Sequence, residues 1–175
     1  MLLGGSFLSE AVIIGYQGIG KSHTVVENPG LYIDFESTNF RDDKGNRPDD
    51  WYVYYCNAAW DMAKQGYRVF TASHEVVRKR FYELQKRDGL DESPLVIIAY
   101  PIPSLKEEWL KRLKDRYDKI PEKKNEIAYL NALDRYTDNI EELHNDAIEY
   151  NFGELKIQNT NYKLHNLIEA FLRED

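Results

Sequence analysis

A glycine-rich loop near the start of the chain constrains its fold more than any other stretch. The segment 11–22 reads AVIIGYQGIGKS, and its second half fits the pattern G-x-x-x-x-G-K-[ST] without a mismatch. The pattern is meaningful only between a strand and a helix. Residues 11–14 are apolar and typical of a buried strand, and residues 22–27 can continue as a helix until the run Asn-Pro-Gly ends it. The sequence therefore predicts a strand, a phosphate-binding loop and a helix, in that order.

The residue types of this loop suit a polyphosphate ligand. Backbone N–H groups can wrap around phosphate oxygens only where Cβ atoms are few, and Gly15, Gly18 and Gly20 provide that freedom. A helix that begins near Lys21 directs its positive end at the same phosphates, and Lys21 adds a full charge. The Ser22 hydroxyl supplies one oxygen for Mg²⁺. ATP and Mg²⁺ are thus the expected cofactors, and the expected contacts are Gly15, Gly18, Ile19, Gly20, Lys21, Ser22 and His23.

Length and composition narrow the class of protein. The chain has 175 residues, and we expect a single domain over residues 1–175. Its net charge of −7 lacks the basic excess of a protein that binds nucleic acid strongly. Cys56 is the only cysteine, which excludes an internal disulfide. The run from Met1 to Gly5 lacks the basic start of a secretory signal, and no apolar run approaches the roughly 20 residues that span a bilayer. We therefore expect a cytoplasmic protein without a membrane segment, and the sequence does not indicate an oligomeric state.

Two carboxylates follow the second expected strand, residues 31–34. Asp34 ends this strand, and Glu36 comes two positions later. In an α/β sheet the carboxyl ends of the strands form the ligand crevice, so both acids are placed to approach Mg²⁺ or an acceptor hydroxyl. A solvated strand end is the alternative, and the sequence does not decide between the two.

A polar stretch over residues 38–50 follows these acids. Its glycine and proline predict a mobile loop, and such loops often close on a substrate. A loop that is only solvated is the alternative to one that meets an anionic acceptor through Arg41, Lys44 and Arg47. The next expected helix covers residues 51–64, and we interpret its aromatic residues, Tyr55 among them, as core rather than as a stacking platform.

The third expected strand, residues 67–72, departs from a common pattern. It leads into Ser73-His74, where many proteins with this loop carry a Walker B aspartate. The third strand therefore does not provide a second protein ligand for the metal, and Asp34 becomes the better candidate for that ligand. His74 lies at the carboxyl end of this strand and is a candidate for a functional role, with a structural role as the alternative.

Strands and helices alternate through the rest of the chain, which predicts a parallel sheet with right-handed crossovers. Ser104 and Glu107 have the spacing of a capping box at the start of a helix. The expected elements are a helix over 75–88, a strand over 95–100, a helix from 104, a helix over 125–148, a strand over 154–158 and a helix over 162–173. In the long helix the expected inward residues are Ile127, Leu130, Ile140 and Leu143.

Two arginines lie four positions apart in the helix that follows the fourth expected strand. Arg112 and Arg116 therefore share one face of that helix. A third arginine, Arg78, lies one turn into the helix after the third strand. A solvated helix face is the alternative to a catalytic role for the pair.

With this loop, these acids and these arginines, the chain resembles small P-loop kinases of the nucleoside and nucleotide kinase group. The resemblance implies a three-layer α/β fold with a five-stranded parallel sheet of order 2-3-1-4-5 between helices. It implies a lid over about residues 104–124 whose Arg112 and Arg116 approach the transferred phosphoryl group, and an acceptor contact from Arg78. The segments DFES, TASH and AYP also resemble uncharacterised P-loop kinases of phages and their bacterial hosts.

The expected function is ATP-dependent phosphoryl transfer to a small acceptor, a nucleoside or a nucleoside monophosphate. The sequence lacks the Asn-Lys-x-Asp signature of GTPases, which argues against a GTPase. It also lacks an apolar strand that ends in Asp-Glu, which argues against a motor ATPase. A nucleotide-binding regulatory protein without transfer is the alternative, supported by the absent Walker B acid. The expected roles are catalysis by Lys21, Asp34, Arg112 and Arg116, metal binding by Ser22 and Asp34, and substrate binding by Asp34, Glu36, Arg41 and Arg78.

Overall fold

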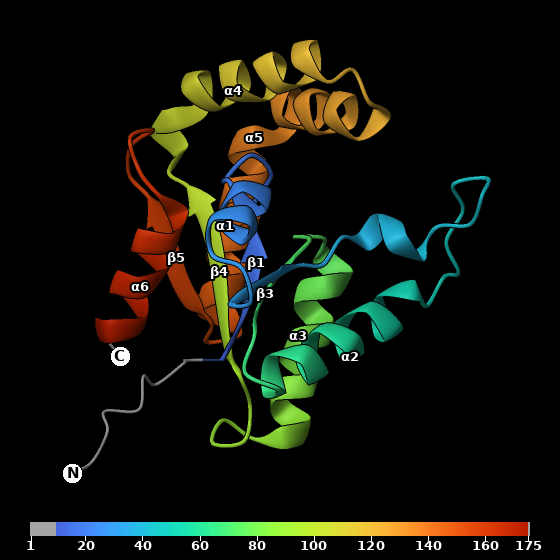
Figure 1. Ribbon diagram of the computed structural model, residues 1–175, viewed down its shortest axis with the longest axis vertical. Helices are drawn as coiled ribbons and strands as arrows, with labels where there is room; N and C mark the ends of the chain where they lie inside the picture. The colour runs from blue at the N-terminus through green and yellow to red at the C-terminus, as the bar shows by residue number, and fades with distance from the viewer. Residues whose placement is uncertain (1–9, 175) are drawn as a thin grey trace.

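The computed structural model describes residues 10–174 and has a five-stranded parallel sheet at its centre (Figure 1). Along the sheet the order is β2-β3-β1-β4-β5, and every neighbouring pair is parallel. This confirms the expected α/β fold and strand order. Residues 1–5, where the sequence showed no secretory signal, lie outside the described residues. The strands are β1 (Ala11–Gly15), β2 (Tyr32–Asp34), β3 (Arg68–Thr71), β4 (Leu95–Pro101) and β5 (Gly153–Ile157).

Helices cover both faces of this sheet. Figure 1 shows α2 and α3 on one side of it and α6 on the other. An ion pair between Arg78 and Asp146 (2.5 Å) joins α5 to α3, and α6 contacts α1. The helices are α1 (Lys21–Glu27), α2 (Trp51–Lys64), α3 (Glu75–Asp88), α4 (Lys106–Lys119), α5 (Lys123–Glu149) and α6 (Leu164–Glu174), with short 3-10 turns η1 (Ser37–Phe40) and η2 (Pro103–Leu105).

The central strand β1 is buried along its whole length. Its first residue, Ala11, pairs with Arg68 of β3 on one side and with Leu95 of β4 on the other. A strand with a neighbour on each edge and helices over each face is in contact with protein in every direction, which explains its uninterrupted apolar sequence. The glycine-rich loop therefore starts from the most firmly held part of the sheet.

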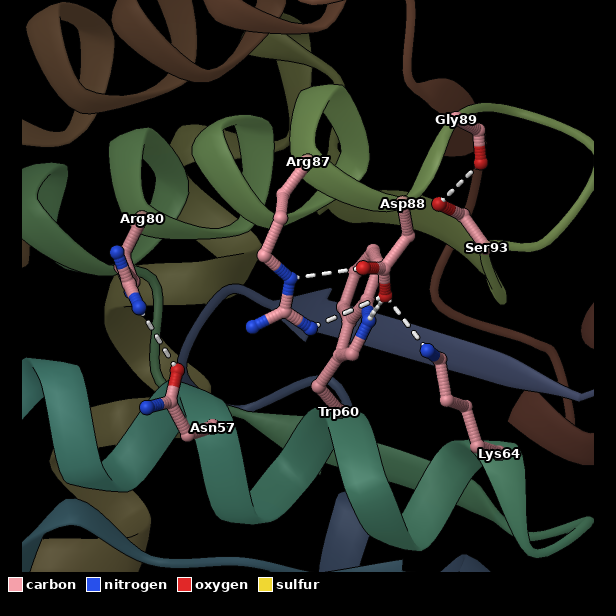
Figure 2. Close-up of polar contacts among 8 residues, drawn as sticks. All are labelled: Asn57, Trp60, Lys64, Arg80, Arg87, Asp88, Gly89 and Ser93. Carbon is pink, nitrogen blue, oxygen red and sulfur yellow. Dashed lines mark hydrogen bonds and ion pairs between the residues drawn. The ribbon is translucent and has the colours of Figure 1, made fainter.

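A polar cluster fixes α2 to α3 at the end of the helices that lies away from this loop (Figure 2). Asp88, the last residue of α3, accepts hydrogen bonds from Arg87 Nε (2.7 Å), Lys64 Nζ (2.6 Å) and Trp60 Nε1 (2.8 Å). These three donors lower the pKa of the Asp88 carboxyl, with Arg87 as the largest cause. Each of these charged groups has a partner, so the cluster serves helix packing.

The expected capping box at Ser104 was wrong. The chain first makes the turn η2, which starts at Pro103, and α4 begins only at Lys106 with Leu105 at its N-cap position and no side-chain cap. Proline has a fixed φ and lacks an N–H donor, so it favours this turn before the regular helix. Ser104 therefore lies before the helix and not at its cap.

The expected inward face of α5 was half wrong. Ile140 and Leu143 are buried, whereas Ile127 and Leu130 are 47% and 46% exposed. In this half of the helix the buried residues are Asn125, Ala128 and Ala132. Small residues let α5 approach the loop closely, and the Gln17 side chain donates to the Ala128 carbonyl (3.0 Å). Close approach here required small inward residues, which a pattern of large apolar residues does not reveal.

Candidate functional site

A cavity of about 590 Å³ opens where β1, β2 and β3 end. The loop after β1, the segment after β2, α4 and the start of α5 form its walls. In Figure 1, α4 and the first half of α5 lie over this end of the sheet. The cavity brings together many of the expected site residues, namely Gly18, Gly20, Lys21, Ser22, His23, Asp34, Glu36, Arg112 and Arg116.

The glycine-rich loop has the backbone that its sequence predicts. Gly18 and Gly20 have φ values of 81° and 102°, a left-handed region that favours glycine. A Cβ atom on Gly15 would lie 2.8 Å from Ile19 Cδ1, so this glycine makes room for the buried Ile19 side chain. Neither Gly15 nor Ile19 lines the cavity. They shape the loop from the core side.

Lys21 folds back over this loop, and its Nζ donates to the Gly15 carbonyl (3.3 Å). Burial lowers the pKa of the Lys21 ammonium, while the charges of Asp34 and Glu36 act in the opposite direction. Arg116 is close enough to lower this pKa as well. The two cations and the two carboxylates therefore share one electrostatic environment.

Ser22 and Asp34 form the oxygen pair that the sequence predicted. Ser22 Oγ donates to Asp34 Oδ2 (2.9 Å), which links the start of α1 to the end of β2. Within residues 10–174 no group of three or more His, Cys, Asp or Glu side chains is arranged to bind a metal by itself. Magnesium in nucleotide sites takes one or two protein oxygens together with phosphate oxygens. Ser22 and Asp34 fit this requirement.

Tyr55 holds the ends of β2 and β3 together. It is fully buried, as expected of a core residue. Its hydroxyl donates to the Phe35 carbonyl (2.5 Å) and accepts from the Ala72 N–H (2.9 Å). Burial raises the pKa of Tyr55, so the hydroxyl keeps the proton that it donates. Tyr55 thereby positions the segment that carries Asp34, a role that no local sequence pattern indicated.

Two arginines, Arg41 and Arg47, form a basic group beside the ends of β2 and β3. The Arg47 guanidinium lies 4.1 Å from the centroid of the Trp51 ring, and Trp51 meets His74 edge to face at 5.7 Å. Within residues 10–174 neither Arg41 nor Arg47 forms an ion pair. Arg47 Nη1 is buried and has no hydrogen-bond acceptor. Burial, and then the charge of Arg41, lowers the pKa of Arg47.

The basic group affects the pKa of His74. Desolvation lowers its pKa, and the positive charges of Arg47, Arg41 and Arg78 lower it further. Both effects favour the neutral form of the His74 ring.

Arg78 does not reach the cavity. Its side chain is buried, its Nε donates to Asp146 Oδ2 (2.5 Å), and its Nη1 donates to the Ser73 carbonyl. Arg41 is exposed and does not line the cavity either. The expected substrate contacts of both residues stay predictions, and the contacts of Arg78 are those of a residue that joins α3 to α5.

The two arginines of α4 share a helix face but have different partners. Arg116 Nε donates to Asn125 Oδ1 (2.8 Å), and the buried Asn125 side chain is itself held by the Ile120 carbonyl (2.8 Å). Arg112 Nη1 donates to the Gly18 carbonyl (2.9 Å) and to the Tyr162 hydroxyl (2.8 Å). Sequence reasoning missed both supporting residues. Tyr162 is distant in the sequence from Arg112, and Asn125 belongs to the next helix, whose packing against α4 is not visible in a local pattern.

Comparison with known proteins supports the fold. The sheet order and the loop define a P-loop kinase-like α/β fold. The structure of the tunicamycin resistance protein of Deinococcus radiodurans matches it with a TM-score of 0.51, over 95% of this chain and 95% of that chain, at 17% sequence identity. No family model and no curated protein matches the sequence. Within residues 10–174 no helix has the length and apolar character needed to cross a membrane.

Proposed function

We propose that the protein transfers the terminal phosphoryl group of ATP to a nucleoside or a nucleoside monophosphate. The observation that carries the proposal is the arrangement of Lys21, Arg116 and the Ser22–Asp34 pair around one cavity. Phosphoryl transfer needs cations at the phosphates and an oriented acceptor, and it needs little covalent chemistry from the protein. The fold is compatible with this activity.

In this proposal the tasks are divided among the groups around the cavity. The loop N–H groups and Lys21 hold the β and γ phosphates. Ser22 and Asp34 would hold Mg²⁺, which neutralises phosphate charge. Arg116 stabilises charge on the moving group. The γ phosphorus forms a bond to the acceptor oxygen as its bond to the bridging oxygen of ADP breaks. If the acceptor is a nucleoside hydroxyl, Asp34 or Glu36 takes its proton, whereas an ionised monophosphate oxygen has no proton to lose.

A second cavity offers room for the nucleoside part of ATP. It has a volume of about 580 Å³, and Thr160 and the outer side of α4 line it. It shares Arg112, Arg116 and Ile120 with the first cavity, so the two are neighbours along α4. We place the base and ribose of ATP here and the acceptor on the other side of the loop.

The acceptor side favours an anionic group. Within residues 10–174, Arg41 and Arg47 have no acidic partner, and Arg47 Nη1 is a buried donor without an acceptor. A buried donor without a partner is costly, and a phosphate or carboxylate supplies acceptor oxygens. These contacts favour a nucleoside monophosphate over a nucleoside.

A nucleotide-binding regulatory protein is the second candidate. The observation in its favour is that β3 ends at Thr71 and is followed by Ala72, Ser73 and His74, with no carboxylate. A protein that only senses ATP needs the loop and not a transfer site. The two candidates differ in whether label leaves ATP.

Incubation with γ-labelled ATP separates them. The acceptor panel contains ribonucleosides and deoxynucleosides, their monophosphates, sugar acids, oligonucleotide ends and tunicamycin. We expect label on one nucleoside or monophosphate class, and loss of transfer by about two orders of magnitude or more in Lys21→Ala, the usual cost of a lost charge-stabilising donor. ATP binding without transfer to any acceptor, under conditions where a control kinase works, would favour the regulatory protein. Transfer to a sugar acid or DNA would keep the kinase and replace the substrate.

A further inference from the structure

The outer side of the phosphate-binding loop is held by three side chains from distant parts of the chain, which we call the carbonyl clamp. Two of them come from α4 and one from the segment before α6. Each binds the backbone oxygen of one loop residue, and the three loop residues are consecutive. The pairs are Trp109 Nε1 to the Gln17 oxygen (2.9 Å), Arg112 Nη1 to the Gly18 oxygen (2.9 Å) and the Tyr162 hydroxyl to the Ile19 oxygen (2.8 Å).

The carbonyl clamp also holds itself together. The Trp109 and Tyr162 rings are nearly parallel, with centroids 6.4 Å apart and an interplanar angle of 7°. The Arg112 guanidinium lies 4.2 Å from the Trp109 centroid and 5.4 Å from that of Tyr162. Such cation–π contacts are favourable, more so when water is excluded. Burial raises the pKa of Tyr162, so its hydroxyl keeps the proton that it donates.

The loop touches α4 closely at one residue. A Cβ atom on Gly18 would lie 3.0 Å from Leu113 Cδ2 and 3.2 Å from Trp109 Nε1. By contrast, a Cβ atom on Gly20 would have no neighbour within 4 Å. Gly18 is therefore required twice, for its left-handed backbone and for its contact with α4. Gly18 therefore packs against α4, whereas Gly20 does not.

The orientation of these carbonyls sets the orientation of the loop amides. In a trans peptide the C=O and the following N–H point in opposite directions. Three carbonyls bound from outside the loop therefore direct the next three N–H groups toward the cavity, where phosphate oxygens accept hydrogen bonds. Preorganised donors avoid the cost of ordering the loop when a ligand binds.

We infer that the carbonyl clamp positions the phosphate-binding loop before a nucleotide arrives, and that Arg112 is a positioning residue rather than the arginine that meets the phosphates. The inference rests on the proposed function only for the class of ligand, a polyphosphate. It also makes the first two turns of α4, which carry Trp109 and Arg112, a fixed wall, because moving them away breaks two hydrogen bonds to the loop. Arg116, one turn further on, is left for the moving phosphoryl group.

Tyr162→Phe tests the inference, because it removes the hydroxyl and keeps the ring. Tyr136→Phe is the matched control, since its hydroxyl also donates to a backbone oxygen, that of Ile102 (2.8 Å), and the substitution keeps the ring that meets Tyr16 edge to face. Calorimetry with ATP and with inorganic triphosphate measures binding. We expect both dissociation constants to rise by about two- to tenfold in Tyr162→Phe, the loss of one net hydrogen bond, and neither to change in the control. Trp109→Phe gives an independent second variant with the same expectation.

The two probes distinguish the clamp from other roles. If Tyr162→Phe weakens ATP but leaves triphosphate unchanged, the residue contacts the nucleoside and the inference is overturned. Equal losses in Tyr162→Phe and Tyr136→Phe would mean a general loss of stability, which also overturns it. A third outcome separates the two proposals. If the parent binds triphosphate, Tyr162→Phe weakens that binding and no label is transferred to any acceptor, the proposed kinase activity is wrong and the inference on the clamp is supported.

Discussion

The two walls of the cavity differ in how their cations are satisfied. On the α4 wall, Arg112 has two hydrogen-bond partners and two aromatic neighbours, and Arg116 is held by Asn125. On the side of β2 and β3, which we call the acceptor wall, Arg41 and Arg47 lie beyond the residues that line the cavity and have no ion-pair partner within residues 10–174. The difference teaches that the protein itself supplies the partners of the α4 arginines, whereas no acidic residue within residues 10–174 pairs with Arg41 or Arg47.

The polar cluster around Asp88 shows what a purely structural arrangement looks like in this protein (Figure 2). There Lys64 and Arg87 both reach the same carboxylate. Arg47 instead stacks on Trp51 and keeps a buried donor without an acceptor. A buried donor without a partner costs free energy. In the proposed function, the phosphate of the acceptor supplies the missing partner.

The largest expected effect tests the α4 wall. Arg116→Met should lower turnover by about three orders of magnitude, the lower end for an arginine that stabilises a transferring phosphoryl group. ATP binding should change much less, because the loop and Lys21 still hold the phosphates. Lys114→Met is the control, an exposed cation of the same helix that lines neither cavity. Steady-state kinetics on both variants decide the matter, and near-normal turnover in Arg116→Met would make this helix face merely solvated.

The phosphate-binding loop and the residues beside it could be predicted because they are close to one another in the sequence. Spacing alone indicated the loop glycines, Lys21 and Ser22, and the position of Asp34 at a strand end placed it near Ser22, as the structure shows (2.9 Å). The strand order came from the resemblance to a kinase group. What the sequence did not indicate is which partner each arginine has, because that depends on packing between distant segments.

Two residues illustrate that limit. Arg78 lies after a strand end, as the sequence indicated, yet Asp146 of α5 holds its guanidinium outside the cavity. Arg112 lies on the expected face of α4, yet Tyr162 and the Gly18 carbonyl bind it. In both cases the helix and the face were correct and the partner came from about 50 or more residues away in the chain. Local periodicity carries no information on such contacts.

The next prediction concerns the acceptor wall. Arg41→Gln together with Arg47→Gln should raise KM for a nucleoside monophosphate by about 10- to 100-fold, because charged hydrogen bonds of roughly 1.5–3 kcal/mol are lost. KM for ATP and for an unphosphorylated nucleoside should stay near the parent values. Lys79→Gln on α3 is the control, an exposed cation that lines neither cavity. An equal change for ATP, or no change for the monophosphate, would contradict the assignment of the anion to this wall.

The smallest expected effect is a change in the pKa of His74 beside the acceptor wall. The positive charges of Arg47 and Arg41 help to lower this pKa. In an NMR titration the His74 ring should take up its proton below the ordinary value of about 6.5. Arg47→Gln should move this pKa upward, since one repulsive charge is gone, and a bound nucleoside monophosphate should do the same. Arg80→Gln, on α3 beside Glu83, should leave it unchanged.

The sign of the linked stability effect follows from the same shift. Because the folded protein takes up this proton less readily than the unfolded chain, the contribution of His74 is fully present above pH 6.5 or so and declines as the pH falls below that value. Urea unfolding of the parent and of Arg47→Gln at pH 7 and pH 5.5 should therefore show a smaller acid loss in the variant. If His74 titrates at its ordinary value in the parent and does not respond to Arg47→Gln, the basic group does not act on the strand end, and the contrast between the two walls loses its electrostatic basis.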